Sequence, residues 1–242
     1  MKDKLLVCLG RGMQMENEGG KWVLTDDLEM VAENSGHLAV RVLPVDDTSD
    51  RCMIGGGELN MLAAIELYRR GPEAYSSAVF AYGERSLYLI NAGGPSESEV
   101  MSGMFGKHLA NFGLPPVQIS VWAAERKRQD DKPSNTGTEL ENAFVLAEYL
   151  GIEELDMVTV SVHWPRTMMF SQLLHEQPQF QHLKLNYYRS EQVLVEADPV
   201  VYGPRWEILR NSTAFKQNFD REALGIYRRL ANFYHDEKPL IT

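Results

Sequence analysis

The spacing of apolar and polar residues changes repeatedly along the chain between a strand pattern and a helix pattern. Short apolar runs at Lys4 to Leu9 and Met157 to Val162 are typical of buried strands. Apolar residues recur at helical spacing from Glu58 to Arg70 and from Glu139 to Leu150. Because parallel strands need crossover connections, this alternation predicts an α/β, Rossmann-like three-layer fold with a mostly parallel sheet and helices on both faces.

The alternation is interrupted once, directly after the first strand. Between residues 13 and 54, turn-forming residues bracket the alternating stretches Lys21 to Leu24 and His37 to Val42, which predict a β-rich insertion. We therefore expect one domain over residues 1–242, with 13–54 as the insertion and 176–242 as a C-terminal extension. Other predicted elements are helices at 100–112, 164–174 and 221–233 and strands at 86–90, 117–122 and 192–196.

Small, polar or charged residues follow the predicted strands, at the edge where open α/β sheets bind ligands. Gly10-Arg11-Gly12 follows the first strand, and His163 and Arg166 follow a later one. Arginine makes bidentate contacts with oxyanions, and the N–H groups of a helix N-terminus favour negative charge. These positions therefore predict a site for a small anionic ligand. The predicted ligand-binding residues are Gly10, Arg11, Gly12, Gly93, Gly94, Ser96, Asn135, Thr136 and Arg166.

His163 is the predicted acid/base group, because an imidazole gains and loses a proton near neutral pH. Glu99 and Glu141 are the predicted catalytic carboxylates, which would orient the imidazole or share in proton transfer. Simpler interpretations stay open: His163 as a structural histidine, and Arg166 in an ion pair with an acidic neighbour. Glu97 is explained by the favourable effect of negative charge at a helix start.

The composition disfavours several classes of protein. A net charge of -10 and a pI near 5.1 argue against a nucleic-acid partner, since phosphate-backbone binding depends on clustered Lys and Arg. No tract approaches the roughly 20 apolar residues of a membrane span, so we expect a cytoplasmic protein with no membrane partner. The Cys, His, Asp and Glu spacings match no metal site. G-x-G-x-x-G and Walker A sequences are absent, which disfavours dinucleotide oxidoreductases and P-loop ATPases.

Taken in order, the motifs at the strand ends resemble the YdcF/SanA-like family, a Rossmann-like domain of unknown function. In that family a glycine-rich turn follows a strand, a Ser-Glu pair opens a helix, an Asn-Thr-x-Glu-Asn tract opens another, and a strand ends in His followed by Arg. The corresponding residues here are Gly10 to Gly12, Gly93-Gly94 with Ser98-Glu99, Asn135-Thr136 with Glu141-Asn142, and His163 with Arg166. The resemblance spans roughly residues 4–175.

The chain departs from the family pattern in several places, among them around Leu59-Asn60 and Asn91-Ala92. Its Asn-Thr-x-Glu-Asn tract is stretched, so that either Glu139 or Glu141 could be the functional carboxylate, and Met13 to Asp50 has no counterpart. The resemblance is closest to the soluble YdcF-type branch and implies a nucleotide-like ligand, with S-adenosylmethionine as the suggested cofactor. Three functions stay open: binding of such a ligand, hydrolysis or transfer on a phosphorylated substrate with His163 as acid/base, and a non-catalytic regulatory module with a vestigial pocket.

Overall fold

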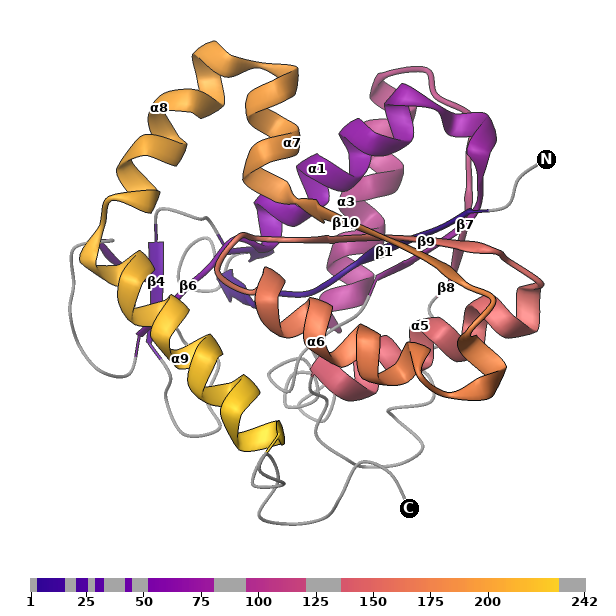
Figure 1. Cartoon of the computed structure of the whole chain (residues 1–242). Coiled ribbons are helices and arrows are strands. Elements are labelled where there is room, and N and C mark those ends of the chain that lie inside the picture. Colours follow the sequence, from indigo (N-terminus) through magenta and orange to yellow (C-terminus); the bar gives the residue numbers. More distant parts are fainter. Residues whose placement is uncertain are drawn as a thin grey trace.

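A computed structural model describes residues 4–15, 21–25, 29–32, 42–44, 52–80, 95–120 and 136–230 of the chain (Figure 1). Five parallel strands form the main sheet in the order β10-β9-β1-β7-β8. Their bounds are β1 (Lys4–Cys8), β7 (Tyr75–Phe80), β8 (Gln118–Ser120), β9 (Glu154–Thr159) and β10 (Lys184–Arg189). The Rossmann-like prediction of a parallel central sheet is confirmed.

Helices cover both faces of this sheet, as Figure 1 shows. One layer contains α1 (Gly57–Arg70), α3 (Glu97–Asn111) and α7 (Ser190–Ala197), and the other contains α5 (Thr136–Leu150) and α6 (Trp164–His175). Successive side chains of a strand point to opposite faces. In β1, Leu6 and Cys8 therefore belong to the first core and Leu5 and Val7 to the second. The central strand is thus buried between two apolar layers.

Most predicted helices begin within a few residues of their expected starts, but the helix predicted at 221–233 begins earlier, at Thr213. Helix α1 begins at Gly57, one residue before its predicted start, and α5 begins at Thr136, three residues before. Gly151, with φ of 64°, ends α5 in the left-handed conformation that glycine adopts most easily. Helix α3 begins with a capping box between Ser96 and Glu99.

The segment after β1 contains two small antiparallel sheets. Strand β2 (Met13–Met15) pairs with β3 (Trp22–Leu24), and β4 (Glu29–Ala32) lies between β5 (Val42–Pro44) and β6 (Cys52–Ile54). This confirms the predicted β-rich insertion. The predicted stretch His37 to Val42 is described only at Val42, and the predicted strand at 86–90 lies outside the described residues.

The strand prediction at 192–196 was wrong, because these residues belong to helix α7. Val193 and Leu194 pack in the core beside α1, so tertiary contacts outweigh the strand preference of the valines. The strand of this region is β10, which ends at Arg189, directly before the helix. The remaining elements are α8 (Pro199–Arg210), α9 (Thr213–Leu230) and the 3-10 turns η1 (Pro72–Ala74) and η2 (Pro178–Phe180).

The strand order places a topological switch point between β1 and β9. From β1 the chain adds β7 and β8 on one side of the sheet, and then returns to add β9 and β10 on the other. The turns that follow β1 and β9 therefore lead to opposite sides, and a crevice at this edge is where open α/β sheets bind ligands. None of the described helices is both long and apolar enough to cross a membrane.

Candidate functional site

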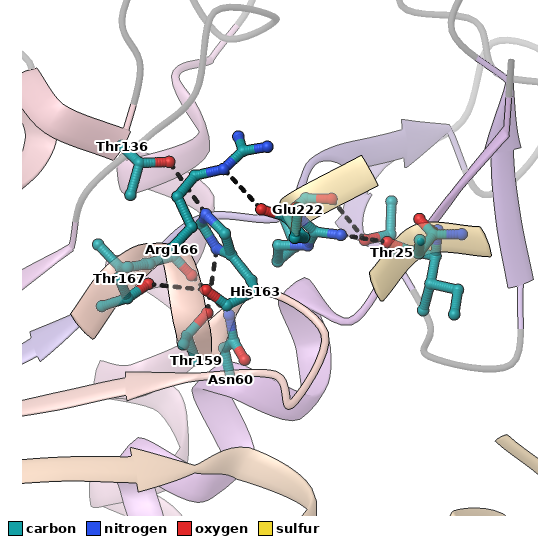
Figure 2. Close-up of polar contacts among 12 residues, drawn as sticks. Thr25, Asn60, Thr136, Thr159, His163, Arg166, Thr167 and Glu222 are labelled. Atoms are coloured by element: carbon teal, nitrogen blue, oxygen red, sulfur yellow. Dashed lines mark hydrogen bonds and ion pairs between the residues drawn. The ribbon is translucent and has the colours of Figure 1, made fainter. Parts of the chain in front are cut away.

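His163 lies at the switch point, at the end of the turn that follows β9 and directly before α6. Both ring nitrogens contact threonine hydroxyls (Figure 2): Nε2 lies 2.9 Å from Oγ1 of Thr136, and Nδ1 lies 3.2 Å from Oγ1 of Thr159. Thr136 is the first residue of α5, and Thr159 is the last residue of β9. One strand and one helix start therefore fix the orientation of the imidazole.

The surroundings of His163 favour its neutral form. Its side chain is buried, and burial, followed by the positive charges of Arg11 and Arg166, holds the pKa of His163 well below its usual value. At neutral pH one ring nitrogen carries a proton and donates, while the other accepts. His163 is thus a neutral hydrogen-bonding group rather than a cation.

Arg11 and Arg166 meet at a single carboxylate, that of Glu222 on α9. Nε of Arg166 lies 2.6 Å from Oε2 of Glu222, and Nη1 of Arg11 lies 3.6 Å from Oε1. Figure 2 shows Glu222 reaching Arg166 on the side away from Thr136. Burial raises the pKa of Glu222, and the two guanidiniums oppose that rise. The carboxylate therefore bridges two arginines that follow adjacent strands.

Each arginine has a second feature that fixes its position. Nη2 of Arg11 donates to the carbonyl of Ile54, the last residue of β6, at 2.9 Å. The guanidinium of Arg166 lies against the backbone of α9 at Gly225, where an added Cβ would stand 2.6 Å from Nη2. A glycine at position 225 is therefore required for this close approach.

The turn after β1 is occupied by a carboxylate of the protein itself. Glu97, the first residue of α3, accepts the backbone N–H groups of Arg11 at 2.8 Å and Gly12 at 2.7 Å. Gly12 has φ of 99°, and a Cβ at Gly10 would stand 2.7 Å from the carboxyl carbon of Glu97. Consecutive N–H groups of this kind form an anion-binding concavity. Glu97 therefore occupies the anion-binding concavity of this turn.

The turn after β9 is held in the same way by α7, the helix that follows the neighbouring strand β10. Glu191 of α7 accepts the backbone N–H of Ser161 at 2.9 and 3.0 Å and its hydroxyl at 2.8 Å. Burial raises the pKa of Glu191. Asn60 of α1 donates to the carbonyl of Leu9 at 2.7 Å, and Ser190 donates to Asn60 at 2.6 Å. Hydrogen bonds from neighbouring helices thus fix both inner turns.

The structure brings together four of the predicted site residues. They are Arg11, Thr136, His163 and Arg166, which surround Glu222 and the turn after β9. Gly10 and Gly12 belong to the turn that Glu97 occupies. Gly93, Gly94 and Asn135 lie outside the described residues.

The other predicted residues of the site lie at helix starts. Ser96 is the N-cap of α3, and Glu99 completes its capping box, with Oε2 accepting the Ser96 N–H at 2.6 Å. On α5, Glu141 is exposed and Glu139 is buried. Of the two carboxylates left open by the stretched tract, Glu139 is therefore the one that faces the protein interior.

Three contributors were missed at the level of sequence: Glu97, Thr159 and Glu222. The position of Glu97 in a helix first turn is explained locally by the helix dipole, which hides its long-range contact with the turn after β1. Glu222 lies more than fifty residues beyond His163 and has no motif around it. The only local signal is that Glu222 lies one helical turn after Asn218, so that both occupy the same buried face of α9.

The fold and the cluster together define the class: an α/β protein with a Rossmann-like core and an arginine–histidine cluster at its switch point. Among the described residues, no group of His, Cys, Asp or Glu side chains has the arrangement of a metal site. No family model, no curated protein and no solved structure matches the chain. Membership of the YdcF/SanA-like family therefore stays a prediction from the motifs.

Proposed function

We propose that the chain binds a small molecule of the nucleotide kind through an anionic group, either the carboxylate of S-adenosylmethionine or the phosphate of a phosphate-bearing ligand, at the switch point between β1 and β9. The convergence of Arg11 and Arg166 on one carboxylate supports this most directly. Two guanidiniums from segments far apart in the chain meet where this fold class binds ligands. Arginine is suited to carboxylate and phosphate groups because its donors form a planar fork.

Two helix starts add to this preference for an anion. Thr136 begins α5, and His163 lies directly before α6, so the positive ends of both helix dipoles are near the cluster. The turn after β1 contributes its side chain at Arg11 rather than its backbone N–H groups, which Glu97 occupies. We therefore assign anion binding to the arginines and the α5 and α6 starts.

Chemistry on a phosphorylated substrate with His163 as acid/base is the second candidate. The 2.9 Å contact between the Thr136 hydroxyl and Nε2 of His163 has the geometry of a hydroxyl and its base. However, Arg11 and Arg166 disfavour protonation of the ring, and the described partner of Nδ1 is a threonine hydroxyl rather than a carboxylate. The surroundings therefore favour a neutral group that orients a ligand over one that accepts a proton.

Calorimetric titration of the full chain with ADP, S-adenosylmethionine and inorganic phosphate tests the proposal. We expect at least one of these to bind, and Arg166→Met to weaken it about 10- to 100-fold, because a charge-assisted contact contributes roughly 1.5–3 kcal/mol. Arg210→Met is the matched control, since Arg210 is half exposed on α8 and pairs only with Glu207 among the described residues. Absence of binding by all three probes would contradict the proposal.

A further inference from the structure

Helix α9 packs against the site with an unusual face. Its buried residues recur at helical spacing and are small or polar: Ala214, Asn218, Glu222 and Gly225. Phe215, in the first turn, packs partly buried against the core and edge-on to Trp206, but the larger apolar side chains Phe219, Leu224, Tyr227 and Leu230 are exposed. A surface helix normally buries its apolar stripe. Burial of apolar area therefore contributes to the attachment of α9 mainly in its first turn, at Ala214 and Phe215.

Polar contacts hold α9 in its place. Oδ1 of Asn218 accepts the backbone N–H of Ile54 at 2.9 Å, and Glu222 bridges Arg11 and Arg166. Gly225 gives the Arg166 guanidinium its place against the helix. Around Glu222 and Gly225 the attachment is thus concentrated on Arg11 and Arg166, to which we assign ligand binding.

We propose that Glu222 occupies the anion subsite itself, and that a carboxylate or phosphate group of the ligand replaces it as α9 moves away. This inference rests on the proposed function and adds the position and chemistry of the anion within that site. A carboxylate that bridges two guanidiniums lies where an oxyanion of a ligand would accept from the same donors.

Exchange of one anion for another avoids the main cost of opening the site. Removing the carboxylate partner of a buried guanidinium is destabilising, whereas an incoming phosphate keeps Arg11 and Arg166 paired with an anion. The released Glu222 regains its hydration, and the burial that raises its pKa is relieved. Since the large apolar side chains Phe219, Leu224 and Tyr227 are already exposed, movement of the part of α9 beyond its first turn forfeits little of the hydrophobic stabilisation.

Glu222→Gln tests this directly, because it keeps the size of the side chain and removes its charge. We expect the variant to bind ADP about tenfold more tightly than the unmodified chain. In the unmodified chain only the molecules whose subsite is not filled by Glu222 can bind, which weakens the apparent affinity. Asp220→Asn is the matched control: Asp220 is exposed on the same helix, so its loss should leave ADP affinity unchanged.

Gly225→Ala provides a second variant that alters no charge. The added methyl group would displace the Arg166 guanidinium from α9, and a flexible side-chain end can move without disrupting the fold. Hydrogen exchange of the amides at 213–230 is the readout. We expect faster exchange in Gly225→Ala than in the unmodified chain, and faster exchange in the unmodified chain when ADP or inorganic phosphate is added.

The outcomes separate this inference from the proposed function. If ADP and phosphate bind neither the unmodified chain nor either variant, the proposed function fails and the exchange idea fails with it. If they bind through Arg166, but Glu222→Gln binds equally or more weakly and α9 exchange does not rise with ligand, only the exchange idea is overturned. Tighter binding by Glu222→Gln with faster exchange in α9 supports both.

Discussion

At the scale of single residues, the cluster is organised around a histidine that the protein keeps uncharged. His163 is buried, contacts two threonine hydroxyls, and has Arg11 and Arg166 as its charged neighbours. Both burial and the two guanidiniums act against a proton on the ring. A neutral imidazole can donate through one nitrogen and accept through the other, which suits recognition of a polar ligand group.

The lowered pKa of His163 predicts a loss of stability in mild acid. Below the ordinary histidine pKa of about 6.5 the unfolded chain takes up a proton that the folded chain resists, so the free energy of unfolding falls as the pH falls. The slope from this one group is at most about 1.4 kcal/mol per pH unit. Urea unfolding between pH 7.5 and pH 5.5 measures it.

His163→Gln should remove this part of the pH dependence. His182→Gln serves as the control, because His182 is about half exposed, beside Glu148. Equal slopes for the unmodified chain and His163→Gln would contradict the assignment of a depressed pKa to His163. Glu191 and Glu222 have raised pKa values, so just above the ordinary carboxylate pKa they make the free energy of unfolding fall as the pH rises, opposite to His163. Both carboxylates are present in every variant, so the difference in slope between variants isolates the histidine.

At the scale of elements, each inner turn of the sheet is held by the start of a helix that follows a neighbouring strand. Glu97 of α3 holds the turn after β1, and Glu191 of α7 holds the turn after β9. The helices thereby do more than cover the sheet. They fix the backbone from which Arg11 and His163 extend, so the arginine–histidine cluster depends on helices that contribute none of its members.

Gly10→Ala tests the contact between Glu97 of α3 and the turn after β1. The new Cβ would stand 2.7 Å from the carboxyl carbon of Glu97, so Glu97 or the turn must shift. We expect a destabilisation of about 1–3 kcal/mol, the usual cost of overpacking, measured as a lower midpoint of urea unfolding. Gly106→Ala within α3 is the control; no atom lies within 4 Å of its added Cβ, and it should stabilise by up to about 1 kcal/mol. Equal effects of the two substitutions would refute the tight contact.

At the scale of the whole molecule, one sheet separates two cores of similar construction. On one face Phe105 lies between Tyr68 and Phe80, with ring centroids 5.7 and 5.2 Å away. On the other, Phe144 stands edge-on to Phe180 at 5.3 Å. Because β1 contributes side chains to both cores, loosening of either face affects the same strand.

Phe105→Ala and Phe144→Ala should each lower the free energy of unfolding by about 3–5 kcal/mol, since both side chains are fully buried. Both should shift one common transition seen by fluorescence and by circular dichroism. Phe112→Ala is the control; its side chain is 57% exposed, and the change should stay within about 0.5 kcal/mol. Two separate transitions, with only one shifted by each variant, would contradict a shared sheet.

The sequence predicts the layered core because local periodicity and burial agree there. Helices α1 and α5 and strand β1 have regular apolar spacing, and the position of His163 and Arg166 after a strand is enough to place them at the C-terminal edge of the sheet. The prediction fails where tertiary contacts override the local pattern. The valines of α7 suggested a strand, and the spacing of α9 does not reveal that its polar face is the buried one.

The carboxylates of the site could not be predicted for a related reason. Glu97 and Glu222 act on residues 86 and more than 200 positions away in the chain, so no window of sequence contains both partners. An acidic residue in a helix is most often solvated, and nothing local distinguishes these from their exposed neighbours. Their roles follow from the strand order, which places distant segments together.

Ile54, at the end of the β-rich insertion, contacts Arg11, just before the insertion begins. Its carbonyl accepts from Arg11, which stands directly after β1, and its N–H donates to Asn218. The insertion therefore leaves and rejoins the core at nearly one place, and the entropic cost of closing such a loop grows only slowly with its length. Related chains with a much shorter or longer insertion can keep the same arginine geometry, provided that the returning strand still ends where position 54 does here.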